Sequence, residues 1–182
     1  MNRLLEMYRL KATTRTGWAR RGVPEPESVA DHSWGAALLC LLFADEAGVD
    51  RARAMEMALT HDLAEALTGD IVVNARSTPP EMDPSEKARL EREAMERLVP
   101  APDHRLRRLW EAYEAHDDPE ARFVRDMDLL DMCLQALIYR RRGAAAPERL
   151  EEFFASADER IETSTGRRLF EAARAAFGRG EC

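Results

Sequence analysis

One short segment holds the densest group of side chains able to do chemistry. His61 and Asp62 are adjacent, and neighbouring residues on a helix point about 100° apart, so both can reach one ion beside it. Glu65 lies four residues after His61 and three after Asp62, which places it on the same helix face. Asp70 follows just past the expected helix end. Alone, a His-Asp pair also fits two side chains that pair with each other or with surface arginines.

Two distant residues favour a metal site. His32 falls in the first turn of the most apolar expected helix, where a buried imidazole requires a partner, either a metal ion or a backbone carbonyl. Asp128 lies at the edge of an apolar stripe, where its partner would be a cation, either an ion or the guanidinium of Arg122 or Arg125. Two imidazoles and two carboxylates together suit a borderline divalent ion such as Mn, Co, Fe, Ni or Zn.

The elements that must position these residues are expected to be helices. Beta-branched residues are sparse and strict alternation is absent, which predicts little or no sheet. A short helix is expected over residues 1–12, and about seven main ones over 29–47, 51–67, 84–98, 103–115, 119–142, 147–160 and 165–177. The apolar helix over 29–47 should be central, and residues 74–84 read as an irregular loop. The fold class is therefore all-α, with one domain over 1–182, a core over about 10–142 and C-terminal helices over 147–177.

Composition narrows the functional classes. The chain has 182 residues and a net charge of −7, which argues against general binding to nucleic-acid backbones. Its three cysteines, Cys40, Cys133 and Cys182, are scattered, as expected of free thiols in the cytoplasm. The longest apolar run, over residues 36–44, is far shorter than the roughly 18–20 residues that a membrane span requires. We therefore expect neither nucleic acid nor a membrane as a partner.

Several separated blocks, taken in order, resemble the HD-domain metal-dependent phosphohydrolases, and more narrowly their 5′-deoxynucleotidase branch. That branch removes phosphate from deoxyribonucleoside 5′-monophosphates. The resemblance runs from about residue 10 to residue 139. It is carried by residues 10–11 and 15–18, 26–32, 61–65 with 69–71, 93–95, 111–114, 121–124 leading to 128, and 134–136.

The resemblance implies one helical HD domain and one divalent metal ion, among Mn, Co, Fe, Ni, Zn and Mg. It assigns the metal ligands to His32, His61, Asp62 and Asp128. It also implies that Glu65 orients the attacking water or carries its proton, and that Asp70 lies near the sugar and phosphate. The substrate would be a small nucleotide. Apolar faces on the last helices would suit a homodimer, as relatives of this type suggest, and would equally suit a closed monomer.

The phosphate-side pair of the family matches less closely. Bacterial members can have arginine directly before tryptophan, whereas here Gly17 precedes Trp18. We assign the arginine to Arg15, with Arg20 or Arg21 as substitutes, and expect it to neutralise phosphate charge. Trp18 is expected to contact substrate or phosphate, although core packing explains a lone tryptophan equally well.

Two other functions fit the same residues. An HD phosphodiesterase or a hydrolase of hyperphosphorylated nucleotides would use two metals, and such enzymes usually bring further histidines between the His-Asp pair and the last aspartate. Here that interval holds only His104 and His116, both in polar surroundings typical of a surface. A catalytically silent metal-binding nucleotide sensor is the other candidate, against which the presence of both Glu65 and Asp70 argues.

Overall fold

The computed structural model describes residues 1–72 and 82–180, and within them the chain is all-α, as predicted. An isolated bridge between Thr14 and Ser28 is the sole β-type pairing in this part of the chain. The elements are α1 (Asn2–Met7), the 3₁₀-helix η1 (Tyr8–Ala12), α2 (Thr16–Arg20), α3 (Val29–Ala47), α4 (Arg51–Thr60), α5 (Glu65–Thr68), α6 (Pro84–Leu98), α7 (Arg105–Ala115), α8 (Pro119–Arg141), α9 (Pro147–Asp158) and α10 (Ser164–Arg179). Most of the loop predicted over 74–84, as well as Cys182, lies outside the described residues.

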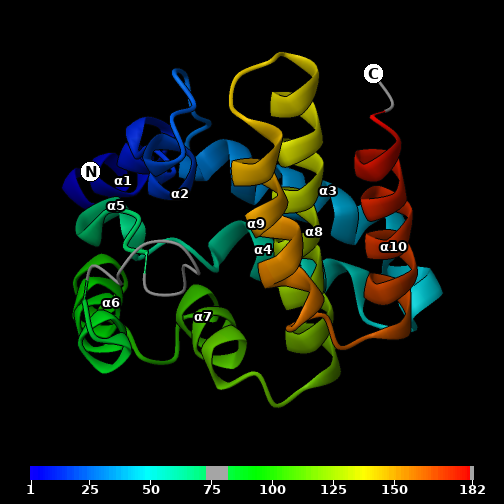
Figure 1. Cartoon of the computed structure of the whole chain (residues 1–182). Coiled ribbons are helices and arrows are strands. Elements are labelled where there is room, and N and C mark those ends of the chain that lie inside the picture. The colour runs from blue at the N-terminus through cyan, green and yellow to red at the C-terminus, as the bar shows by residue number, and fades with distance from the viewer. Residues whose placement is uncertain (73–81, 181–182) are drawn as a thin grey trace.

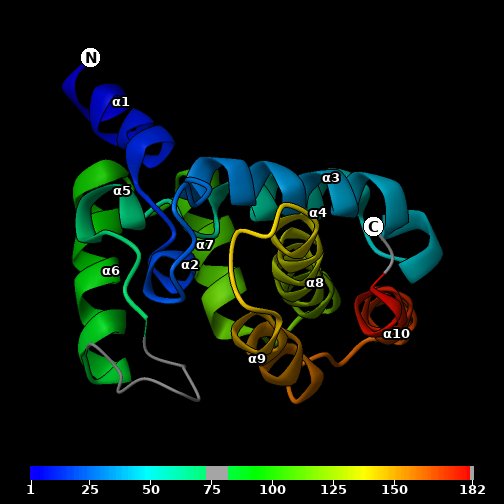
Figure 2. The ribbon, with the colours of Figure 1, turned by 45° about the horizontal axis from the view of Figure 1, so that its top comes forward.

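The long helix α8 is the axis of the larger core. Phe123, Met127 and Leu130 of α8 are buried in a cluster that also includes residues of α3, α4, α9 and α10. Figure 1 shows α9 and α10 running beside α8, while Figure 2 shows α3 lying across α8 on the side away from α9. This arrangement holds the middle of α8 against the first half of α3, which is where Asp128 and His32 lie.

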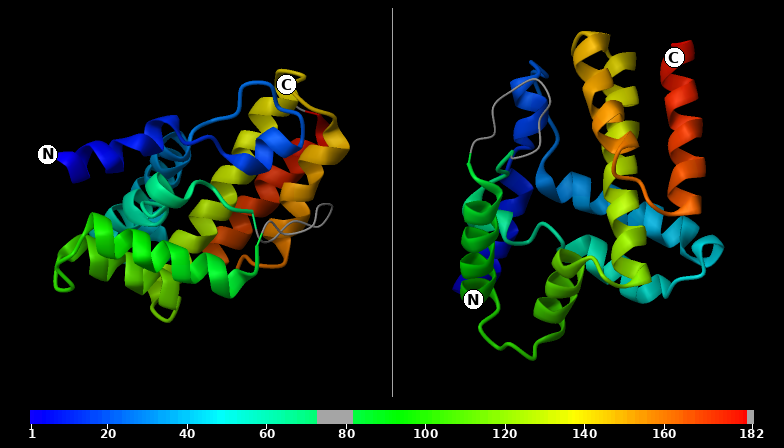
Figure 3. Two further views of the ribbon diagram at one scale, coloured as in Figure 1. Left: turned by 90° about the vertical axis from the view of Figure 1, so that its left-hand side faces the viewer. Right: turned by 60° about the horizontal axis from the view of Figure 1, so that its bottom comes forward.

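A second, smaller core forms at the other end of the molecule. It joins η1, α6 and α7 through buried residues such as Leu10, Met95 and Trp110, and it includes Val29 at the start of α3. Figure 3 shows α1 projecting from this end of the molecule. Since α3 begins in the smaller core and continues in the larger one, its first turn lies at the junction of the two, and so does His32.

The expected helix over 51–67 is two helices. Helix α4 ends at Thr60 and α5 begins at Glu65, with a turn between them. Across this turn the backbone N–H groups bond three residues back: Leu63 N lies 3.1 Å from Thr60 O and Glu65 N 3.0 Å from Asp62 O. Such bonding is that of a tightened 3₁₀ turn, which the apolar pattern cannot distinguish from a continuing α-helix. His61 and Asp62 therefore lie in a turn rather than within a helix.

Helix α3 is bounded as predicted but is not covered on every side. Ser28 and Asp31 form a reciprocal capping box at its start, and Gly48 ends it at φ 70°. Trp34 and Leu42 are, however, 65% and 60% exposed. The apolar residues of α9 and α10, in contrast, are packed against α8. Helix α3 thus carries an exposed apolar face, and Leu4, Leu5 and Tyr8 near the N-terminus are exposed as well.

Other predictions from the sequence agree with the structure. Cys40 and Cys133 are buried free thiols, and burial raises the pKa of Cys40 to about 12. Asp126 of α8 lies outside the predicted site and accepts hydrogen bonds from the backbone N–H groups of Glu162 and Thr163, next to the start of α10. Among the described helices none is long and apolar enough to cross a membrane.

Candidate metal centre and its cavity

Two buried imidazoles converge where α3, the 61–64 turn and α8 meet. The centroids of the His32 and His61 rings lie 5.3 Å apart. Each ring is held through Nδ1: His32 Nδ1 lies 2.7 Å from Asp131 Oδ2, and His61 Nδ1 lies 2.7 Å from the carbonyl oxygen of Ala58. A hydrogen bond donated from Nδ1 to an oxygen leaves Nε2 with its lone pair free. Both Nε2 atoms are buried, and neither has a hydrogen-bond partner.

Two carboxylates complete the group. Asp128 Oδ1 lies 3.1 Å from His32 Nε2, and Asp62 Oδ2 lies 3.2 Å from His61 Nε2 and 3.7 Å from His32 Nε2. Atoms of His32, His61 and Asp128 all lie within 4.8 Å of one another, as the donors of one metal ion would. The structure thus brings the four predicted ligands together, although they are separated by up to 96 positions in the chain.

The pKa shifts of the clustered side chains indicate that the site requires further positive charge. Burial alone would lower the pKa of His32, but the adjacent carboxylates of Asp128 and Asp131 raise that pKa well above its usual value. Burial alone would raise the pKa of Asp128, but His32 holds it well below its usual range. The carboxylates therefore remain charged and draw positive charge to the imidazoles. A divalent cation supplies that charge directly, and the two unpartnered Nε2 atoms fit such an ion.

Asp131 and Gly35 orient His32, and sequence reasoning gave neither a role. Asp131 lies one turn beyond Asp128 on α8, and Gly35 lies three residues after His32 on α3. A Cβ atom built on Gly35 would lie 2.0 Å from Asp131 Oδ1. Only glycine therefore leaves the space that the Asp131 carboxylate occupies when it accepts from His32. The sequence carries no signal for this contact, because a glycine within a helix does not show which distant side chain fills the space beside it.

Glu65 lies beside the cluster, at the start of α5. Its Oε1 is 3.8 Å from Lys87 Nζ, and its Oε2 is buried without a hydrogen-bond partner. Burial, with the nearby charges of Asp62 and Asp70, raises its pKa well above the usual value. A raised pKa makes this carboxylate a stronger proton acceptor than an ordinary glutamate, which suits acid–base chemistry.

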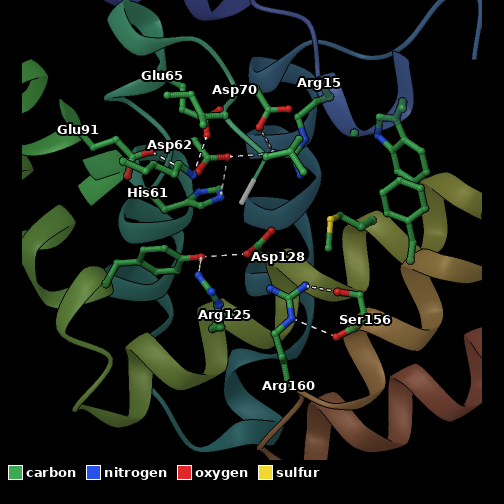
Figure 4. Close-up of a pocket in the computed structure, with 18 of the residues that line it drawn as sticks. Arg15, His61, Asp62, Glu65, Asp70, Glu91, Arg125, Asp128, Ser156 and Arg160 are labelled. Atoms are coloured by element: carbon green, nitrogen blue, oxygen red, sulfur yellow. Dashed lines mark hydrogen bonds and ion pairs between the residues drawn. The ribbon is translucent and has the colours of Figure 1, made fainter. Parts of the chain in front are cut away.

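Arg15 and Asp70 lie at the other edge of the cluster (Figure 4). The guanidinium nitrogen NH1 of Arg15 is 3.6 Å from Asp62 Oδ2 and 3.5 Å from Asp70 Oδ1. Asp70 also accepts from the backbone N–H of Thr16 at 2.5 Å, and its carbonyl accepts from the Thr16 hydroxyl at 2.7 Å. Asp70 therefore fastens the short helix α2, and Arg15 with it, to the segment that carries the His-Asp pair.

Trp18 and the substitute arginines have different surroundings. Trp18 is buried, stacks on Phe153 with ring centroids 3.8 Å apart, and donates its indole N–H to Glu27 at 2.8 Å. It borders the cavity, so contact with a substrate stays a prediction beside its packing role. Arg21 is buried and paired with Glu152 at 2.8 Å, whereas Arg20 is exposed.

A cavity of about 190 Å³ opens onto the cluster. Its wall includes Tyr113, whose hydroxyl donates to Asp128 Oδ2 at 2.9 Å and accepts from Arg125 at 3.1 Å. Residues of α6, α8 and α9 form much of the remaining wall. His104 caps the start of α7 and His116 ends it, and neither of them lines this cavity.

Comparison with known proteins agrees with this geometry. The family model described as "HD domain" matches residues 7–167 of the chain. This chain belongs to the HD-domain family. A relative from Danio rerio named "5'-deoxynucleotidase HDDC2" is 39% identical, over 82% of this chain and 73% of its own length. One from Homo sapiens with the same name is 38% identical, over 81% and 71%. A solved structure, "Conserved hypothetical protein from Pyrococcus furiosus Pfu-403030-001", superposes with TM-score 0.78 at 31% identity, covering 96% of this chain and 98% of its own.

The packing of Gly35 against Asp131 predicts a metal-binding defect at a residue that touches no metal. We expect Gly35→Ala to displace the Asp131 carboxylate, release His32 Nδ1 and weaken metal affinity by roughly 10- to 100-fold. Competition with a chromophoric chelator measures this affinity. Gly178→Ala, on α10 with no atom within 4 Å of the new Cβ, is the control and should bind metal as the native chain does. Unchanged affinity in Gly35→Ala would contradict the role given to Asp131.

The buried Glu91 predicts a pH-dependent loss of stability. Burial raises the pKa of Glu91 to about 7, even though the ammonium group of Lys87 lies 3.2 Å away. The pKa of Glu91 is higher in the folded chain than in the unfolded chain, so protonated Glu91 stabilises the fold. This contribution to the free energy of unfolding is fully present below the unfolded pKa of 4.5 and is lost as pH rises through about 7. Glu91→Gln should lack this loss, so that between pH 4.5 and 8 it gains on the native chain by on the order of 3 kcal/mol. Urea denaturation at several pH values measures the difference, and parallel pH profiles would refute it.

Proposed function

We propose that this chain is a metal-dependent 5′-deoxynucleotidase, which hydrolyses (deoxy)ribonucleoside 5′-monophosphates to a nucleoside and phosphate. The observation that carries the proposal is the pair of buried, unpartnered Nε2 atoms of His32 and His61, set beside two carboxylates at a cavity. Relatives that match most of the chain at 38–39% identity are named for this activity. We take the substrate to be a small molecule, because the net charge of −7 argues against nucleic acid as a partner.

His32, His61, Asp62 and Asp128 would hold one divalent ion, among Mn, Co, Fe, Ni, Zn and Mg. Two neutral imidazoles and two carboxylates balance the charge of such an ion, and Nδ1 of each imidazole is already held in the orientation that ligation requires. When bound, the ion supplies Lewis-acid polarisation of the phosphate and an acidified water.

Glu65 would take the proton of the attacking water. It is buried beside the ligands, and its Oε2 has no hydrogen-bond partner in the protein. The ammonium group of Lys87 lies 3.8 Å from Glu65 Oε1, and it would hold the carboxylate in place whenever Glu65 is ionised. Glu91 also pairs with Lys87, at 3.2 Å. The ammonium charge is therefore shared between two carboxyl groups and offsets the charge of Glu65 only in part.

On the opposite edge, Arg15 would neutralise phosphate charge as that charge redistributes. Its two carboxylate partners hold the guanidinium in place before substrate arrives. Asp70 would accept a hydrogen bond from the 3′-hydroxyl of the sugar or help to protonate the leaving 5′-oxygen. Trp18 would form part of the wall against which the substrate packs.

The phosphodiesterase alternative requires further ligands that are not near the centre. His104 and His116 lie at opposite ends of α7 and outside the cavity. The other candidate metal group among the described residues, formed by Glu27, His32 and Asp131, shares His32 with the first. Its Asp131 is already the hydrogen-bond acceptor for His32. These facts favour one metal ion per chain, and a measured ratio near two would favour the diesterase.

We also propose that the protein acts in the cytoplasm as a homodimer through the exposed face of α3. The face consists of Trp34, Leu38, Leu41 and Leu42, which are 37–65% exposed. Apolar side chains gathered in this way on one helix commonly mark an interface. The free thiols suit the cytoplasm. We take the occupant of the face to be a second copy of the chain because the resemblance to the family implies a homodimer.

Metal removal and replacement tests the activity. After the protein is stripped of metal, Mn²⁺, Co²⁺, Zn²⁺ or Mg²⁺ is added singly, and phosphate release is measured from deoxyribo- and ribonucleoside 5′-monophosphates, a 3′-monophosphate and a cyclic nucleotide. We expect release from the 5′-monophosphates to return with at least one ion. Glu65→Ala should lower it by roughly 100-fold or more, because it removes a proton acceptor in the transition state.

Glu93→Ala is the matched control. Glu93 is an exposed residue of α6 that pairs only with Arg89 among the described residues, at 2.6 Å, and the variant should hydrolyse as the native chain does. Failure to release phosphate from any 5′-monophosphate with any ion would reject the nucleotidase. Tight nucleotide binding without turnover would then establish the silent sensor.

The dimer is tested by sedimentation. We expect the native chain to sediment as a dimer, and Leu42→Asp to sediment as a monomer because a carboxylate would be buried at the interface. A native monomer at micromolar concentration would rule out this use of the α3 face.

A further inference from the structure

The cationic side chains of the cavity fall into two groups. Five lysine and arginine residues line it. Three have carboxylate partners: Arg15 pairs with Asp62 and Asp70, Arg21 with Glu152, and Lys87 with Glu65 and Glu91. These three charges are compensated within the protein.

Arg125 and Arg160 are different. In the part of the chain that the structure describes, neither has a carboxylate oxygen within ion-pair distance. Arg125 donates to the hydroxyl of Tyr113 at 3.1 Å. Arg160, in the turn after α9, donates to the carbonyl and hydroxyl oxygens of Ser156, both at 3.0 Å. Each guanidinium is therefore held by neutral groups and has no direct ion pair within this part of the chain, and Asp128 attracts both charges only from a longer distance.

Both arginines are half-buried, so this charge has a cost. Burial lowers the pKa of Arg160. The negative charge of Asp128 raises this pKa, and the positive charge of Arg125 lowers it further. Arginine nevertheless stays protonated at any pH at which the protein works. Two like charges held in one cavity, partly out of water, are stabilised by an anion that can accept several hydrogen bonds.

Their position relative to the metal centre identifies the anion. Asp128 lies between Arg15 on one side and the pair Arg125 and Arg160 on the other (Figure 4). A divalent ion would be balanced by Asp62 and Asp128, and Arg15 is balanced by Asp70. A phosphate dianion bound at the ion would then meet Arg15, whose charge Asp70 already offsets in part, on one side. On the other side it would meet two guanidinium groups that form no ion pair with the described residues.

We propose that Arg125 and Arg160 form an anion subsite that binds phosphoryl oxygens from the Asp128 side of the metal centre, opposite Arg15. The inference rests on the proposed function, in which the substrate is a phosphate monoester. Tyr113 and Ser156 are positioning residues, since each holds one guanidinium without contributing charge. The subsite brings the turn after α9, in the C-terminal part of the chain, into substrate binding.

Binding of inorganic phosphate tests the subsite without requiring turnover. Isothermal titration of phosphate, and separately of a deoxynucleoside, is carried out on the Co²⁺-loaded protein and on Arg125→Gln and Arg160→Gln. We expect each variant to weaken phosphate binding by roughly tenfold or more, because it removes charge-assisted hydrogen bonds, and to leave deoxynucleoside binding unchanged. Arg168→Gln, an exposed arginine of α10 paired with Glu46, should change neither.

The other outcomes separate the explanations. Weakened deoxynucleoside binding with unchanged phosphate binding would place the arginines at the base or sugar and overturn the proposal, as would no change in either ligand. If Arg160→Gln lowers the unfolding temperature, Arg160→Lys decides: retained phosphate binding supports the subsite, and joint loss of both ligands overturns it. Arginine-dependent phosphate binding in a protein that hydrolyses no 5′-monophosphate would uphold the subsite and reject the nucleotidase.

Discussion

The orientation of two buried imidazoles is the constraint on which the rest of the structure depends. A histidine can serve a metal ion only if one ring nitrogen is held by an acceptor and the other faces the ion. His61 meets this condition locally, through the carbonyl of Ala58 three residues earlier. His32 meets it across the fold, through Asp131 on α8. The crossing of α3 and α8 is thus fixed at one point by a hydrogen bond, and Gly35 allows the two helices to approach closely enough to make it.

The break between α4 and α5 serves the same end. If the helix had continued, the backbone carbonyls after Thr60 would all be directed along one axis, and Glu65 would lie a full α-turn from His61. In the tightened turn, side chains three residues apart eclipse each other, so Asp62 and Glu65 project from the same side of the backbone. Gly69, at φ 76°, then redirects the backbone so that Asp70 meets Arg15 and the N-terminus of α2. The segment over residues 61–70 therefore contacts α2 through Asp70, α3 through Asp62 and α6 through Glu65.

The sequence was sufficient for the residues that identify themselves by type and spacing. Helical periodicity predicted the long helices, and the separated blocks predicted the His-Asp pair with His32 and Asp128. The sequence was not sufficient to predict residues whose role depends on a contact between distant positions in the chain. Nothing near Gly35 indicates that Asp131, 96 residues away, fills the space beside it. The exposure of Trp34 was also missed, because an apolar helix looks the same whether its last face meets a neighbouring helix or solvent.

Charge balance connects these contacts to function. Every carboxylate near the metal centre faces a cation or an imidazole: Asp62 faces Arg15, Asp70 faces Arg15, and Asp128 faces His32. An ion added at the centre displaces protons from the imidazoles and leaves the cluster near neutrality. The cavity beyond it then carries the excess positive charge of Arg125 and Arg160, whose other contacts are with neutral oxygens. A site that is neutral where the metal would lie and positive beside it suits an anion, such as the phosphate group of the proposed nucleotide substrate.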